Sequence, residues 1–255
     1  MQAKFNPALA EGYTSTSQRI RILSEGWVSQ EVFCPSCGSA INKYENNRPV
    51  ADFYCSICKE DYELKGKSGG IGNKIVDGAF DAVIKRLRSD TNPNLFMLNY
   101  NSRTYEVVNF FVIPKYFFVP DIIEKRKPLS PHARRAGWVG CNIILESIPQ
   151  TGKVFYVKDK QVEPKEAVIR SWQKTLFVKN EVEVSARTWV LDIMSCIEKL
   201  GKSQFSLNNM YDFEDYLWSK HPNNRHVKEK IRQQLQVLRD NSYLEFVGKG
   251  QYKLT

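Results

Sequence analysis

The sequence lacks the patterns that mark a membrane or exported protein. None of its apolar runs approaches the length of a transmembrane helix, so we expect no contact with a membrane. Residues 1–7 include neither an apolar signal core nor a small-residue cleavage site, and we therefore expect a cytoplasmic protein. Apolar residues still make up 42% of the 255 positions, which excludes a disordered chain and favours two folded domains.

Motifs of two common enzyme classes are also missing. Residues 66–68 read Gly-Lys-Ser, like the end of a phosphate-binding P-loop, but Asp61 stands where that loop needs its first glycine. None of the three histidines begins the His-x-Glu motif that a zinc deaminase requires. The sequence therefore excludes a P-loop ATPase and a zinc deaminase.

The cysteines that are present have the spacing of a structural zinc site. Cys34 and Cys37 form one Cys-x-x-Cys pair, and Cys55 and Cys58 form a second pair after seventeen intervening residues. Thiolates bound to a metal are more common than disulfides in a reducing cytoplasm, and four thiolates close a tetrahedral Zn²⁺ site. We predict a structural Zn²⁺ on these four residues. The two remaining cysteines, Cys141 and Cys196, are predicted to be buried apolar residues.

Three candidate catalytic residues flank the second cysteine pair. On a strand, Glu63 and Lys65 would project from the same face, and a hairpin would bring Asp52 beside them. Two carboxylates that bind Mg²⁺ and one ammonium meet the needs of phosphodiester hydrolysis. The Glu-x-Lys triplet alone is weak, because it recurs at residues 163–165. A surface salt bridge between Glu63 and Lys65 is the alternative interpretation.

Positive charge is concentrated in two segments. The net charge is +9, residues 125–135 contain no acid, and residues 220–239 contain six basic residues and one acid. Either segment alone could be a solvated surface, but two of them in one chain favour a nucleic-acid partner.

Residues 1–181 have the mixed pattern of an α/β domain. Short strands are predicted at residues 50–54 and 61–64, joined by the second cysteine pair, and buried strands at 94–100 and 105–113. Helices are predicted at residues 8–26 and 77–87, with a flexible glycine-rich loop at 65–72. In the first helix, Tyr13, Ile20, Leu23 and Trp27 have roughly helical spacing.

Residues 182–255 have the pattern of an α+β winged helix. A helix at residues 187–200 is predicted to stop at Gly201, a second helix begins at Ser206 as N-cap, and a third begins near Pro222. A hairpin with a glycine turn covers residues 243–253. The third helix is predicted to read a DNA groove, and the candidate residues on or just before it are Asn223, Asn224, Arg225, Lys228 and Arg232. Lys249 in the wing is predicted to contact a phosphate. Winged helices that mediate protein contacts are the alternative.

A basic loop in the first domain supplies further candidate DNA contacts. Arg134, Arg135 and Trp138 lie within the sequence Arg-Arg-Ala-Gly-Trp-Val-Gly. Trp138 is predicted to touch a base or a methyl group, although a tryptophan more often anchors a core.

With these residues assembled, the chain resembles the DpnI family of type IIM restriction endonucleases almost from end to end. The closest stretches are residues 45–55 (Glu-Asn-Asn-Arg-Pro-Val-Ala-Asp-Phe-Tyr-Cys), 133–138 (Ala-Arg-Arg-Ala-Gly-Trp) and 228–240 (Lys-Glu-Lys-Ile-Arg-Gln-Gln-Leu-Gln-Val-Leu-Arg-Asp). The resemblance implies a PD-(D/E)xK nuclease core with a zinc ribbon, a winged helix, and a bacterial host. The motif proline, which should directly precede the aspartate, stands three residues upstream at Pro49.

The resemblance also implies a site and a substrate. Asp52, Glu63 and Lys65 become the catalytic set, and the carbonyl of Leu64 joins Asp52 and Glu63 as a Mg²⁺ ligand. The substrate is double-stranded GATC with a methylated adenine, read by both domains. We expect a monomer without an obligatory protein partner.

Three functions follow as hypotheses. The first is a Mg²⁺-dependent endonuclease that cuts adenine-methylated GATC. The second is a non-catalytic DNA reader or transcription regulator with a zinc ribbon and a winged helix. The third is a nuclease indifferent to methylation.

Overall fold

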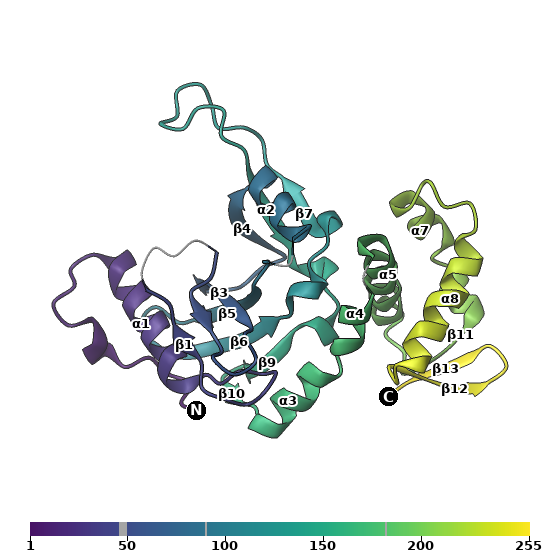
Figure 1. Cartoon of the computed structure of the whole chain (residues 1–255), viewed down its shortest axis with the longest axis horizontal. Helices are drawn as coiled ribbons and strands as arrows, with labels where there is room; N and C mark the ends of the chain where they lie inside the picture. The colour runs from purple at the N-terminus through teal and green to yellow at the C-terminus, as the bar shows by residue number, and fades with distance from the viewer. Residues whose placement is uncertain (46–49, 90, 182) are drawn as a thin grey trace. The chain divides into compact units, whose positions relative to one another are not determined.

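The computed structural model describes residues 1–45, 50–89, 91–181 and 183–255 (Figure 1). The chain divides into two compact units. The N-terminal unit comprises residues 1–145 and 151–175, and the C-terminal unit comprises residues 146–150 and 176–255. Within the described ranges, none of the helices combines the length and the apolar character that a bilayer crossing requires.

A seven-stranded mixed sheet forms the centre of the N-terminal unit. Its strand order is β1-β2-β3-β5-β6-β9-β10. The pair β3 and β5 is parallel, and the other neighbouring pairs are antiparallel. The strands are β1 (Asn42–Lys43), β2 (Phe53–Tyr54), β3 (Asp61–Ser68), β5 (Asn94–Tyr100), β6 (Val107–Ile113), β9 (Val154–Lys158) and β10 (Gln161–Val162).

Two helices supply the main core on one face of this sheet. Helix α1 (Thr16–Glu31) contributes Leu23 and Trp27, and helix α3 (Lys165–Gln173) contributes Trp172. These side chains pack in one buried cluster with residues of β2, β3, β5, β6 and β9. Within the cluster Tyr62 stacks on Phe96, with ring centroids 4.5 Å apart and planes inclined by 9°. Aromatic burial of this kind fixes the pairing of β3 with β5.

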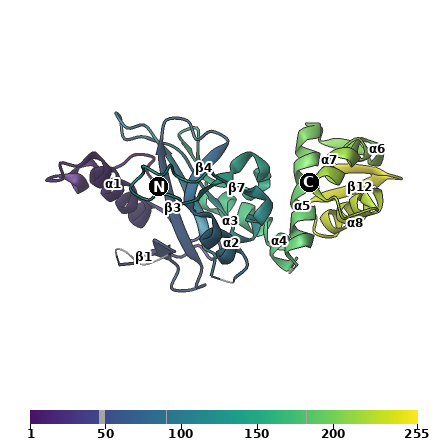
Figure 2. The same ribbon diagram turned by 90° about the horizontal axis from the view of Figure 1, so that it is seen from above.

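A smaller antiparallel sheet and a helix lie toward the opposite face. The sheet has the order β4-β8-β7, and its strands are β4 (Lys74–Ala79), β7 (Ile123–Lys125) and β8 (Gly140–Ile144). Helix α2 (Phe80–Leu87) follows β4 directly. Val83 and Leu87 of α2 line a narrow recess with Leu95 of β5 and Ile123 of β7. In both views, α1 and α2 lie on opposite sides of β3 (Figures 1 and 2).

The remaining short elements complete the description. They are the 3-10 helices η1 (Pro7–Ala10), η2 (Lys115–Phe117), η3 (Pro120–Ile122), η4 (Leu145–Ser147) and η5 (Gln150–Gly152), and the helix α4 (Leu176–Asn180). The isolated cysteines Cys141 and Cys196 are both fully buried, as predicted.

The C-terminal unit is a winged helix. Its helices are α5 (Val184–Leu200), α6 (Leu207–Tyr211), α7 (Glu214–Lys220) and α8 (Val227–Asp240). Its strands β11 (Gln204–Ser206), β12 (Leu244–Gly248) and β13 (Gln251–Leu254) form an antiparallel sheet with the order β11-β13-β12. Ile193 and Ile197 of α5 are buried, as are Ile231 and Leu235 of α8. The predicted α/β core with a C-terminal winged helix is therefore confirmed.

Two predicted helix boundaries in this unit are confirmed by their caps. Gly201 ends α5 in the left-handed conformation at φ 62°, where a glycine avoids the steric cost of a β-carbon. The Ser206 side chain accepts a hydrogen bond from the amide of Asn209, whose own side chain accepts from the amide of Ser206. This reciprocal capping box starts α6.

Several predicted elements are corrected by the structure. The helix predicted at residues 8–26 is interrupted, because Gly12 turns the chain at φ 84° and α1 begins only at Thr16, which leaves Tyr13 42% exposed. The loop predicted at 65–72 is strand up to Ser68, because Ser68 still pairs with Tyr100 of β5. Pairing with a neighbouring strand overrides the local glycine signal.

The helix predicted at residues 77–87 begins only at Phe80. Asp77 pairs with Cys141 of β8 and therefore belongs to a strand, and a bulge between Asp77 and Ala79 precedes the helix. The helix predicted from Ser206 is divided into α6 and α7 around Asp212 and Phe213. The wing also contains a third strand, β11, that the sequence did not indicate.

Two predictions lie outside the described residues. The position of Pro49 relative to Asp52 falls within residues 46–49, and the domain boundary placed between residues 181 and 182 involves Val182.

Candidate active site and zinc centre

The two Cys-x-x-Cys pairs fold into equivalent turns. The amide of Gly38 donates to the carbonyl of Cys34 at 2.8 Å, and the amide of Lys59 donates to the carbonyl of Cys55 at 3.0 Å. Gly38 and Lys59 each follow the second cysteine of their pair and have positive φ values of 74° and 62°. This turn directs both cysteines of a pair toward the same point.

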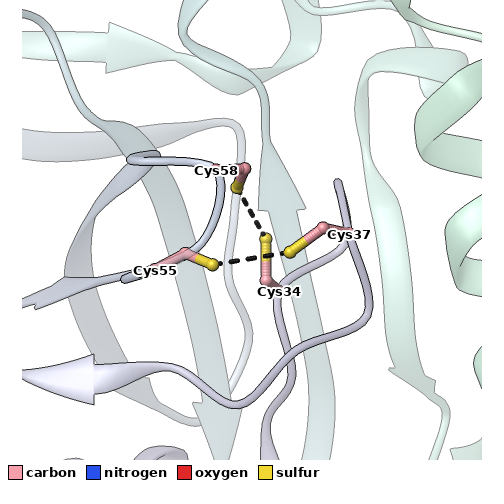
Figure 3. A group of neighbouring side chains, drawn as sticks. All are labelled: Cys34, Cys37, Cys55 and Cys58. Atoms are coloured by element: carbon pink, nitrogen blue, oxygen red, sulfur yellow. Dashed lines mark hydrogen bonds between the residues drawn. The ribbon is translucent and has the colours of Figure 1, made fainter.

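The four sulfur atoms converge on one point (Figure 3). All of them lie within 4.8 Å of one another, with 3.4 Å between Cys34 and Cys58 and 3.5 Å between Cys37 and Cys55. A tetrahedral ion with Zn–S bonds of about 2.3 Å places its sulfurs about 3.8 Å apart, so the cluster fits Zn²⁺. Burial raises the pKa of the Cys37 thiol, but hydrogen bonds from Ser39 and the other cysteines outweigh burial and lower it to about 6.

The second cysteine pair is also the turn of the hairpin formed by β2 and β3. Phe53 pairs with Tyr62, and the amide of Asp52 donates to the carbonyl of Tyr62 at 2.9 Å. The hydroxyl of the buried Tyr62 lies 3.1 Å from the sulfur of Cys34. Tyr62 of β3 therefore contacts the four-cysteine cluster with its side chain and Asp52 with its backbone.

The predicted triplet lies on β3 beside Asp52. The amide of Leu64 donates to Oδ2 of Asp52 at 2.7 Å, so this carboxylate lies against the backbone between Glu63 and Lys65. Because the N–H and C=O of one strand residue point to the same side, the carbonyl of Leu64 also faces the Asp52 side of β3. The Nζ atom of Lys65 lies 2.8 Å from Oε1 of Glu63.

The structure adds a residue that the sequence did not indicate. Oδ1 of Asp77, on β4, lies 2.8 Å from Nζ of Lys65. Arg86 of α2 lies 3.9 Å from a carboxylate oxygen of both Glu63 and Asp77. The sequence predicts a helix at Asp77 and therefore gives no sign that this residue meets Lys65. The pairing of β4 with β8 brings the Asp77 carboxylate to the end of the Lys65 side chain.

These acids determine the charge of Lys65. Burial lowers the pKa of Lys65, but the charges of Glu63 and Asp77 and their hydrogen bonds outweigh burial, so the pKa is raised above its usual value. Burial raises the pKa of Asp77, but Lys65, a backbone hydrogen bond at Gly78 and Arg86 outweigh it and lower the pKa. Lys65 is therefore an ammonium at neutral pH, suited to donate hydrogen bonds and not to accept a proton.

The predicted basic loop forms an arm that extends from β7 and β8 (Figure 1). At its base the amide of Leu129 donates to the carbonyl of Trp138 at 2.9 Å. Arg134 is exposed, and the guanidinium of the exposed Arg135 lies 4.7 Å from the centre of the Trp138 ring. The half-buried indole also lies against Gly140, where an added β-carbon would be 2.7 Å from two ring atoms. Gly140 thus leaves room for the observed position of Trp138.

The predicted DNA-reading residues of the C-terminal unit are divided between a loop and a helix. Helix α8 begins at Val227, so Asn223, Asn224 and Arg225 lie in the preceding loop and not on the helix. The side chain of Asn224 accepts a hydrogen bond from the amide of His226 at 2.8 Å, a local turn that competes with helix formation. The helix start predicted near Pro222 was therefore wrong.

Lys228 and Arg232 lie on the first turns of α8, as predicted. Lys228 pairs with Glu214 at 3.0 Å, and Arg232 donates to the hydroxyl of Tyr211 at 3.1 Å. Lys249 is exposed at the turn of the wing between β12 and β13. Both paired cations remain on the surface, where such ion pairs exchange readily for a phosphate.

The loop before α8 borders an open depression of about 570 Å³. Trp189 lines this depression and stacks on His221 with ring centroids 3.8 Å apart. Asp192 of α5 accepts from Lys220 and lies 2.8 Å from Nε2 of His221. This cluster anchors the start of the loop that carries Asn223.

Two protein-family models match the sequence. The model of the Dam-replacing family (DpnI) matches residues 1–181, and the model of the Dam-replacing HTH domain (DpnI_C) matches residues 185–254. The chain belongs to the Dam-replacing family. Membership identifies a DpnI-like restriction enzyme, a hydrolase that depends on DNA modification and whose partner is DNA.

Removal of zinc should abolish DNA cleavage by this family member, even in excess Mg²⁺. The reason is that the second cysteine pair joins β2, which Asp52 directly precedes, to β3, which carries Glu63. Cys58→Ser should lose bound zinc and weaken the protection of the Leu64 amide in hydrogen exchange. Cys196→Ala, a buried cysteine outside the cluster, should retain zinc and protection. Full cleavage by protein shown to be free of zinc contradicts this prediction.

Gly140→Ala should displace the indole of Trp138. The added methyl group would overlap two ring atoms of Trp138. A methyl group added at Gly78, which lies at the neighbouring bulge, would meet no atom within 4 Å. We expect Gly140→Ala to change Trp138 fluorescence and weaken binding of modified DNA at least about tenfold, the lower range for one buried contact. Gly78→Ala should change neither quantity. Equal binding by both variants shows that the position of Trp138 does not matter.

Proposed function

We propose that the chain is a Mg²⁺-dependent endonuclease that cleaves double-stranded DNA at GATC sites with methylated adenine. Asp52, Glu63 and Lys65 form its PD-(D/E)xK catalytic set, and the products carry 5′-phosphate and 3′-hydroxyl ends. The single observation that carries this proposal is the hydrogen bond of 2.7 Å that fixes the Asp52 carboxylate against the backbone of the Glu63–Lys65 triplet.

The oxygen atoms at this place suit magnesium. The carboxylates of Asp52 and Glu63 and the carbonyl of Leu64 are hard ligands of the kind that Mg²⁺ prefers, and all three come from one hairpin. When bound there, the ion would neutralise the charge that develops on the phosphate and lower the pKa of a bound water. The thiolates of the four-cysteine cluster bind zinc better than they bind magnesium, so each of the two sites favours a different metal.

Lys65 acts on the phosphate through its positive charge. Its ammonium is held by two carboxylates and keeps its proton at neutral pH, as the raised pKa indicates. It can donate hydrogen bonds to a phosphate oxygen and orient a water for attack. Abstraction of the proton from that water is left to another group or to bulk solvent.

Methyladenine recognition is assigned to Trp138 and to the winged helix. The methyl group of N6-methyladenine protrudes into the major groove, where an apolar surface gains from its burial. Trp138 lies at the base of a basic arm with Arg134 and Arg135 exposed beside it. In the C-terminal unit, Asn223, Asn224 and Arg225 on the loop, Lys228 and Arg232 on α8, and Lys249 in the wing supply the contacts.

A comparison of two plasmids tests the whole proposal. The protein should cut plasmid from a host that methylates adenine at GATC into fragments, and it should leave plasmid from a host without that activity intact. Cleavage of both plasmids would support a nuclease indifferent to methylation. Binding of the methylated plasmid without cleavage, in the presence of Mg²⁺, would support the non-catalytic reader.

Asp52→Ala should abolish cleavage and leave DNA binding nearly intact. Loss of a metal ligand costs several kcal/mol of transition-state stabilisation, which is on the order of a thousandfold in rate. Cleavage is measured under single-turnover conditions, and binding is measured by fluorescence anisotropy without divalent ions. Asp81→Ala, an exposed aspartate on α2, serves as the matched control and should cleave normally. Normal cleavage by Asp52→Ala shows that the site assignment is wrong.

A further inference from the structure

The ammonium of Lys65 is held between two carboxylates that come from different sheets. Glu63 lies two residues away on β3, and Asp77 lies on β4 of the smaller sheet. Both carboxylates have an oxygen 2.8 Å from Nζ. Their surroundings differ, because the Asp77 side chain is 6% exposed and the Glu63 side chain is 24% exposed.

Asp77 is fixed more firmly than an ordinary surface partner. Its backbone pairs with Cys141 of β8, and the chain bulges directly after it. The second carboxylate oxygen lies 3.9 Å from the guanidinium of Arg86 on α2. A buried, paired carboxylate with a fixed backbone can define the position of a flexible lysine, whose side chain otherwise has many rotamers.

The carboxylates of Glu63 and Asp77 have different roles in the proposed reaction. Glu63 is a proposed Mg²⁺ ligand, and an oxygen that binds a divalent ion attracts an ammonium much less strongly. Asp77 then remains as the charged partner that keeps Nζ from turning away. This argument rests on the proposed function of Glu63 and Lys65, and it adds a role for Asp77.

We propose that Asp77 is a positioning residue that holds the Lys65 ammonium in place for the phosphate while Glu63 binds the metal. It acts through Lys65 and touches neither the metal nor the DNA. The alternatives are that Asp77 is itself a metal ligand or that it is only a structural neighbour.

Asp77→Asn should slow cleavage by about ten- to a hundredfold, which is the loss expected when a catalytic group is misplaced and not removed. The rate constant is measured in single turnovers at saturating DNA. The dissociation constant for DNA and the Mg²⁺ concentration at half-maximal rate should stay within about twofold of the wild-type values. Glu124→Gln, which removes the partner of Lys74 in the same small sheet, should leave all three quantities unchanged.

A double-mutant cycle separates the three roles. In a Lys65→Met background, Asp77→Asn should reduce the residual rate by less than about twofold, because both changes remove the same function, the placed ammonium. If Asp77→Asn slows the Lys65→Met variant by the same factor as it slows the wild type, or if it raises the Mg²⁺ concentration at half-maximal rate, Asp77 is a metal ligand and the proposal is overturned. An unchanged rate for Asp77→Asn in the wild-type background identifies a structural neighbour and also overturns it.

Two further measurements keep the test independent of activity and folding. Urea unfolding of the zinc-loaded protein without Mg²⁺ should show coupling between positions 65 and 77, so the two midpoint shifts should not add. Asp77→Glu keeps the negative charge and should therefore cleave faster than Asp77→Asn. This variant tests the proposal if Asp77→Asn is poorly folded. Cleavage at the wild-type rate by Lys65→Met refutes the catalytic set itself, whereas a normal rate for Asp77→Asn with an inactive Lys65→Met refutes only the role of Asp77.

Discussion

The antiparallel pairing of β2 with β3 is the contact on which both candidate sites depend. Its turn supplies Cys55 and Cys58, Asp52 directly precedes β2, and β3 carries Glu63 and Lys65. A hairpin with only two paired positions is marginal in water. Four converging thiolates at one end and the parallel pairing of β3 with β5 give this short hairpin a single register.

Tyr62 connects the two ends of this arrangement. Its ring is buried against Phe96, its hydroxyl contacts Cys34, and its carbonyl accepts from Asp52. Alternation along β3 sends Tyr62 into the main core and sends Glu63 and Lys65 toward α2 and β4. A metal ion bound by the four cysteines on one side of the sheet would thereby restrain the carboxylates that face the other side.

Much of the fold and part of the site could be predicted from local patterns. The cysteine spacing, the apolar runs of β5 and β6 and the caps at Gly201 and Ser206 each arise within a few residues, and each was placed correctly. Predictions failed where a distant strand or a local turn decides the conformation. Residues 65–68 and Asp77 are strands only because β5 and β8 pair with them, and α8 starts late because Asn224 caps a turn.

The amino-acid sequence is enough to predict the four clustered cysteines, the β2–β3 hairpin and the Glu-x-Lys triplet, because each is encoded in spacings of two to three residues or in the turn geometry that both cysteine pairs share. Tertiary structure alone decided that Asp77 reaches Lys65 and that Gly140 accommodates Trp138. The contact of Asp77 with Lys65 joins strands that are placed by their pairing with β8 and β5, and the contact of Gly140 with Trp138 depends on the pairing of Trp138 with Leu129 at the base of the arm. Periodicity reports which face a side chain occupies, but it carries no information about which distant residue meets it there.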